Sequence, residues 1–108
     1  LEVGKRQTNE KISGGLCDAI ITPTPGKLTF PLMKKYCVGG IVVTDEQVMK
    51  AIALAFTRLR IVIEPGGAVA LAAALFHSKK CDNETIIAVV SGGNIDPDIF
   101  KKALETEF

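Results

Sequence analysis

Ser91, Gly92, Gly93 and Asn94 form the stretch best suited to chemistry, because a hydroxyl, two glycines and an amide directly follow an apolar run. That run, Thr85–Val90, is rich in β-branched residues, which is typical of a strand buried on both faces in a parallel sheet. Ligands of open α/β sheets bind just outside the carboxyl ends of such strands. Glycine permits positive φ and close approach of the backbone to a flat or anionic ligand, and Ser91 is the first side chain to meet it. Taken alone, the same residues also fit a plain strand-to-helix turn.

Glu64 is the second candidate, because it stands at the start of a helix that is apolar on all sides. Pro65 suits the first helical position, and the run Ala68–Phe76 has no polar face, which predicts a helix buried all round. An acid among such neighbours has to be paired or functional. The alternative is a carboxylate that only complements the amino end of the helix.

Regular elements alternate along the chain in a way that predicts an α/β fold. Strands are expected at residues 16–21, 41–43 and 85–90, and helices from Leu28 to the glycines at 39–40, then over 48–59, 68–76 and 97–104. Thr44 and Gln47 form a capping box, with Val48, Ile52, Phe56 and Leu59 on one helix face that packs on the sheet, and Asp96 caps the last helix ahead of Pro97. This order predicts a three-layer, mostly parallel sheet flanked by helices, with right-handed crossovers.

Composition excludes several classes of protein. The 108 residues carry a formal charge of +1, so no overall field favours nucleic acid or an anionic membrane. Three cysteines without a close pair argue against a disulfide scaffold and a zinc site, and the single His77 cannot build a metal cluster. The longest apolar run is far shorter than the roughly 20 residues of a membrane span, and no secretory signal opens the chain. We therefore expect a cytoplasmic protein without a metal.

Three stretches together resemble a known family. They are Leu16–Ala19 with Thr24–Phe30, then Glu64–Ala72, then Val90–Asp96. In order and spacing they resemble the threonine and serine dehydratases, pyridoxal-phosphate (PLP) enzymes of fold type II, the tryptophan synthase β-like group that includes serine racemase. The resemblance covers about residues 13–108 and implies that these form the carboxyl-terminal portion of the large PLP-binding domain, after a flexible or linker-like start at 1–12.

The resemblance also implies roles for the site residues. Ser91 would hydrogen-bond the pyridine nitrogen, Gly92 and Gly93 would line the edge of the ring, and Glu64 resembles the acid on the pyridine side of the pocket. A neutral hydroxyl does not hold a proton on that nitrogen as a carboxylate does, so the ring is a weaker electron sink. The implied activity is therefore β-elimination from a hydroxy amino acid, giving a 2-oxo acid and ammonia.

Two family features are missing from the printed sequence. None of the ten lysines stands in the Ser-x-Lys-x-Arg-Gly context of the Schiff-base lysine, and the tetraglycine phosphate loop is absent. We therefore expect a fragment that is inactive alone and whose partner is the amino-terminal part of the same enzyme, a homo-oligomer when full-length. Serine racemase, hydroxyaspartate dehydratase and a non-catalytic docking module remain the alternatives.

Overall fold

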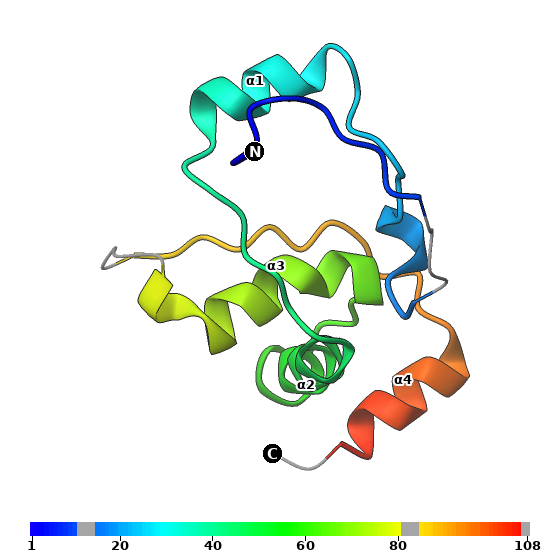
Figure 1. Ribbon diagram of the computed structural model, residues 1–108. Helices are drawn as coiled ribbons and strands as arrows, with labels where there is room; N and C mark the ends of the chain where they lie inside the picture. Colours follow the sequence, from blue (N-terminus) through cyan, green and yellow to red (C-terminus); the bar gives the residue numbers. More distant parts are fainter. Residues whose placement is uncertain (11–14, 81–84, 107–108) are drawn as a thin grey trace.

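The computed structural model describes residues 1–10, 15–80 and 85–106, and its regular structure is helical (Figure 1). A central pair of helices, α2 and α3, lies between α4 and an extended segment that begins at residue 85. The elements of the described residues are η1 (Asp18–Ile20), α1 (Thr29–Tyr36), α2 (Asp45–Leu54), the π-helical turn η2 (Ala55–Leu59), α3 (Pro65–Phe76), η3 (Ser78–Lys80) and α4 (Pro97–Leu104).

The core lies where α2 packs against α3 and α4. Ile52, from the last turn of α2, and Ile63, which precedes α3, are the largest side chains that are almost fully buried. Phe56 and Phe100 meet edge to face, with ring centroids 5.2 Å apart, and so join η2 to α4. Small residues allow the helices to approach closely, and the buried cluster consists of Val48, Ala51, Ile52, Ala55, Ile63, Ala68, Ala72 and Ala103.

The predicted helix starts are confirmed. The Thr44 hydroxyl accepts a hydrogen bond from the Gln47 N–H at 3.2 Å, and Gln47 Oε1 accepts from the Thr44 N–H at 3.0 Å, which completes the capping box. Asp96 accepts from two N–H groups of the first turn of α4, with Pro97 at its first position. His77 Nε2 lies 3.2 Å from Gln47 Oε1, so the end of α3 is tied to the start of α2.

Two helix predictions need correction. Leu59 does not join the buried face of the second helix, because the chain widens into the π turn η2 and leaves this side chain 62% exposed. Arg60 then ends the helix in the left-handed region at φ 60°. The helix that starts after Leu28 ends at Tyr36, before the glycines at 39–40, because the backbone is already extended at Cys37.

The expected sheet is not formed among the residues that the structure describes. A strand is predicted at Leu16–Ile21, but residues 18–20 of this segment form the 3-10 turn η1. Residues 41–43 and 85–90 are extended and belong to no ladder. A strand is stabilised by hydrogen bonds to a neighbouring strand, and within the described ranges no backbone hydrogen bond joins residues 41–43 or 85–90 to another segment.

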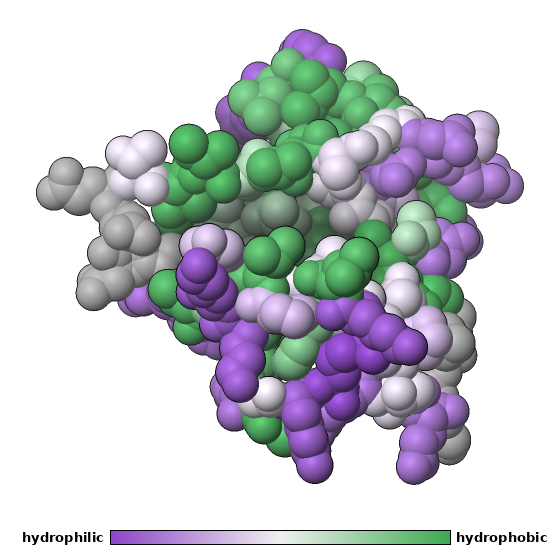
Figure 2. Space-filling view, turned by 90° about the horizontal axis from the view of Figure 1, so that it is seen from above, coloured by the Kyte–Doolittle hydropathy of each residue, from purple (hydrophilic) through white to green (hydrophobic). Residues whose placement is uncertain are grey.

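Several apolar side chains of these extended segments are exposed, where the sequence predicts burial. Val42 is 87% exposed and Ile87 is 88% exposed. Seen from above, apolar side chains spread around a hollow on this face of the molecule (Figure 2). The expectation that α3 is buried all round is also wrong, since Ala68 and Ala72 are buried against α2 while Leu75 and Phe76 are exposed.

The first ten residues lie against the loop that precedes α1. The Asn9 N–H donates to the Pro23 carbonyl at 2.9 Å, and Arg6 Nε donates to the Pro25 carbonyl at 2.8 Å. Among the described residues, no helix is both long enough and apolar enough to cross a bilayer.

Candidate functional site

The amino end of α3 meets the turn that contains Ser91–Asn94, and Glu64 makes the connection. Its backbone N–H donates a hydrogen bond to the Gly92 carbonyl at 3.0 Å. Its side-chain Oε2 accepts a hydrogen bond from the Asn94 N–H, also at 3.0 Å. Although Glu64 is the N-cap residue of α3, its side chain makes no hydrogen bond to that helix. The sequence also allowed a carboxylate that only complements the amino end of the helix. The structure instead shows a specific hydrogen bond from the turn to this carboxylate.

Glycines in the turn and in the helix permit this contact. A Cβ on Gly67 would lie 2.8 Å from the Gly92 carbonyl oxygen and 2.9 Å from the Gly92 nitrogen. A Cβ on Gly93 would lie 2.8 Å from the Val62 carbonyl oxygen. Gly92 and Gly93 do not have positive φ. Their described role is thus the close approach of backbone to backbone, not the unusual φ that the sequence allowed.

A cavity of about 410 Å³ opens beside this junction. Glu64 lines it together with Asn94, while Gly92 lies against the Glu64 carboxylate, with a Cβ built there only 2.6 Å from Oε1. Polar and acidic groups form much of its wall, so it suits a ligand that offers hydrogen-bond donors. The lining residues are Gly15, Leu16, Asp18, Ala19, Glu64, Pro65, Gly66, Asn94, Asp96 and Ile99.

Ser91 is on the surface and is not part of the wall of this cavity. Its side chain is exposed and makes no hydrogen bond within the described ranges. The predicted site residues Glu64, Gly92 and Gly93 thus come together around the turn, and Ser91 leads into that turn from the extended segment.

Asn94 belongs to the stretch that the sequence singled out for its amide side chain, but the described contact uses its backbone N–H, which any residue except proline carries. Gly67 was not among the predicted site residues, and it contributes by lacking a Cβ. Its spacing of one helical turn from Glu64 was the available hint, because both residues then belong to the first turn of α3.

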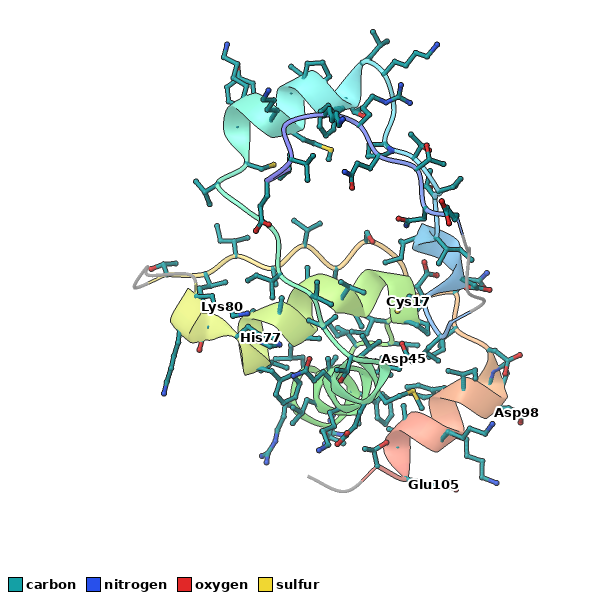
Figure 3. All side chains as sticks on the ribbon, viewed as in Figure 1. Cys17, Asp45, His77, Lys80, Asp98 and Glu105 are labelled. Carbon is teal, nitrogen blue, oxygen red and sulfur yellow. The ribbon has the colours of Figure 1, made fainter. Side chains whose placement is uncertain are left out.

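Cys17 lies near the start of α2, opposite Asp45 (Figure 3). Partial burial raises the pKa of the Cys17 thiol, and the negative charges of Asp45 and Asp18 raise the pKa further. The thiol therefore stays protonated and is a poor nucleophile at neutral pH. No group of three or more histidine, cysteine or acidic side chains among the described residues is placed to hold a metal ion.

Comparison with known proteins identifies the family. The family model for the pyridoxal-phosphate dependent enzyme matches residues 2–92. This chain belongs to that family. The predicted resemblance to the threonine and serine dehydratases is thereby confirmed, and PLP is the cofactor of the family.

Two curated relatives cover most of this chain. Serine racemase from Dictyostelium discoideum is 40% identical over 92 residues, which are 82% of this chain and 28% of the relative. L-threonine ammonia-lyase from Thermotoga maritima is 33% identical over 102 residues, which are 93% of this chain and 25% of the relative. The chain therefore spans between a quarter and a third of the length of these relatives.

Solved structures agree with this family. The T.th. threonine deaminase superposes with a TM-score of 0.82 at 35% identity, over 88% of this chain and 32% of that one. The serine racemase of Dictyostelium discoideum gives a TM-score of 0.75 at 36% identity, over 88% of this chain and 30% of that one. These likenesses support the α/β fold of the family, although the described residues themselves form no strand.

The residues present fit one part of a PLP site. A ring nitrogen needs a hydrogen-bonding group that is not already committed, and the exposed Ser91 hydroxyl is such a group within the described structure. The turn that follows Ser91 is fixed by backbone contacts to α3. The donor set therefore suits the pyridine end of the cofactor.

Proposed function

We propose that this chain is one part of a PLP-dependent threonine or serine ammonia-lyase and supplies the wall that faces the pyridine ring. The supporting observation is the uncommitted hydroxyl of Ser91 beside a turn that is anchored to the first turn of α3. The proposed reaction is the β-elimination of a hydroxy amino acid to a 2-oxo acid and ammonia. Cysteines without a close partner in the sequence support a reducing compartment such as the cytoplasm.

Each site residue has a proposed task. Ser91 donates a hydrogen bond to the pyridine nitrogen, Gly92 and Gly93 border the ring edge, and Glu64 borders the same end of the site. Bound PLP supplies an electron sink, and a neutral hydroxyl partner keeps that sink weak, which favours elimination or racemisation over transamination. Ser91 thus orients the ring and leaves its nitrogen unprotonated.

The rest of the site belongs to the part of the family domain that this chain does not span. The extended segments support this assignment, because Ile87 and Val42 expose apolar side chains that a covering sheet and helices would bury. We propose that the amino-terminal part of the enzyme pairs with residues 85–90, completes the sheet and brings the Schiff-base lysine. The chain alone is then inactive, and the completed enzyme is a homo-oligomer.

Reconstitution tests this function. The 108-residue chain is mixed with PLP and the part of Thermotoga maritima L-threonine ammonia-lyase that precedes the matched region. We expect the yellow absorbance of protein-bound PLP and the release of a 2-oxo acid from threonine, neither of which the chain gives alone. A stable complex with neither signal contradicts the proposal and leaves the docking-module alternative.

Ser91→Ala tests the key residue in the reconstituted enzyme. Loss of one hydrogen bond should weaken PLP binding by about three- to tenfold. Ser78→Ala, in the surface turn η3, is the matched control and should leave PLP binding unchanged. Equal PLP affinity in the two variants would remove Ser91 from the site.

Serine racemase is the second candidate function. The Dictyostelium serine racemase is more similar to this chain, at 40% identity, than the Thermotoga threonine ammonia-lyase, at 33% identity. Threonine, L-serine and 3-hydroxyaspartate assayed side by side separate the candidates, because only a racemase forms D-serine.

A further inference from the structure

We propose that Glu64 is a positioning residue that fixes the Ser91–Asn94 turn and thereby the place of the Ser91 hydroxyl. This inference rests on the proposed function for its catalytic consequence. The contact itself belongs to this chain and can be measured without a cofactor.

Glu64 holds the turn at two points. Its N–H binds the carbonyl of Gly92, and its carboxylate binds the N–H of Asn94, each at 3.0 Å. The carbonyl and the N–H belong to residues on either side of Gly93, so the two bonds span the turn. Two hydrogen bonds from one residue define the orientation of the turn and not only its distance from α3.

The space around the carboxylate shows that this contact is tightly fitted. A Cβ on Gly92 would lie 2.6 Å from Glu64 Oε1 and 3.1 Å from Oε2. Any side chain at position 92 would therefore push the carboxylate away from Asn94. Gly67 allows the turn to reach the helix, since a Cβ at that position would meet the backbone of Gly92 at 2.8 Å.

Electrostatics favours a carboxylate at this position. Glu64 stands at the amino end of α3, where unpaired N–H groups and the helix dipole attract negative charge. A carboxylate also accepts hydrogen bonds more strongly than a neutral amide does. The helix thus stabilises the charge, and the charge binds the turn that follows Ser91.

Amide exchange in the 108-residue chain tests the contact directly. In Glu64→Ala the Asn94 N–H loses its acceptor and should exchange about tenfold or more faster, because a hydrogen bond to a charged group is among the stronger ones. Glu64→Gln keeps an acceptor oxygen and should recover much of the protection. Glu105→Ala, which removes an exposed carboxylate after α4, is the matched control and should leave Asn94 exchange unchanged. Unchanged Asn94 exchange in Glu64→Ala would overturn the proposal.

A double-mutant cycle in the reconstituted enzyme tests the consequence for the cofactor. If Glu64 acts by placing Ser91, then Glu64→Ala should weaken PLP binding in the parent enzyme but add little once Ser91 is alanine. Fully additive losses would show that Glu64 acts by another route. If reconstitution gives no PLP binding at all, the proposed function fails, while the exchange measurement still decides whether Glu64 fixes the turn.

Discussion

The helix pair α2 and α3 and the extended segments 41–43 and 85–90 differ in how their side chains are covered. Within α2 and α3, Ile52 and Ala72 have no exposed surface. In the extended segments, Val42 and Ile87 expose 87% and 88% of their surface, although both side chains are purely aliphatic. In α2 and α3 the backbone polar groups are paired within each helix and the apolar side chains pack between the helices. The extended segments need a neighbouring strand to pair their backbone groups. The extended segments 41–43 and 85–90 are thus the region that the rest of the family domain is proposed to cover.

The largest contrast in stability should come from shortening one isoleucine side chain in each of the two regions. Ile52→Ala leaves a cavity among α2, α3 and α4, and should lower the free energy of unfolding by about 2–5 kcal/mol. Ile87→Ala removes a side chain that is already in water, and should change the free energy of unfolding by less than about 0.5 kcal/mol. Urea unfolding followed by helical circular dichroism measures both.

Ile52→Ala and Ile87→Ala should also differ in a second way once the complementary polypeptide is added. Ile87→Ala should then weaken the complex, because the side chain becomes buried on assembly. Equal effects of the two substitutions in the isolated chain would show that the two regions do not differ as described.

A smaller difference in stability is expected between substitutions at two adjacent glycines in the first turn of α3. Gly67→Ala drives a methyl group into the backbone of Gly92, and should destabilise the fold by about 1–3 kcal/mol despite a better helix propensity. A Cβ on Gly66 would lie 3.2 Å from the Ile20 side chain, which can shift, and 3.5 Å from the Ala19 Cβ, which is an ordinary contact. We expect this control to be neutral or stabilising by up to about 1 kcal/mol in the same urea experiment. A Gly67→Ala variant as stable as Gly66→Ala would contradict the backbone contact.

The smallest effect concerns the thiols of Cys17, which packs on the helical core, and Cys37, which follows α1. Cys17 is half-buried and its pKa is raised, whereas Cys37 is exposed in the segment after α1. Alkylation requires the thiolate, so iodoacetamide at pH 8 should label Cys17 severalfold more slowly than Cys37. A rise in pH should speed the labelling of Cys17, because the folded protein holds that proton until more alkaline pH. Peptide mass spectrometry assigns each site. Faster labelling of Cys17 than of Cys37 would show that the Cys17 thiol is more exposed to solvent than described.

Sequence reasoning located the helices better than the sheet. The capping box at Thr44 and Gln47, the cap at Asp96 and Pro65 at the start of α3 are local signals, and each is confirmed. The β-branched run at 85–90 predicted a buried strand, but a strand depends on partners that are distant in sequence. The π turn at the end of α2 had no sequence signal, since it changes the register of Leu59 without any special residue type.

The candidate site was predicted in outline only. The sequence singled out Glu64 and the pair Gly92 and Gly93. The structure brings Gly92 into contact with Glu64, and Gly93 close to the Val62 carbonyl. The bond from the Asn94 N–H could not be predicted, because backbone donors are common to almost every residue. The role of Ser91 toward PLP stays a prediction that rests on the family resemblance and on the free hydroxyl.

Amide hydrogen exchange at residues 86–91 tests the central claim most directly. In the isolated chain these amides should exchange at nearly the rate of an unstructured peptide, while amides in the middle of α2 are protected. When the complementary polypeptide and PLP are added, exchange at 86–91 should slow by about a hundredfold or more, as expected for a strand inside a sheet. Strong protection in the isolated chain, or fast exchange that persists in an active reconstituted enzyme, would contradict the account.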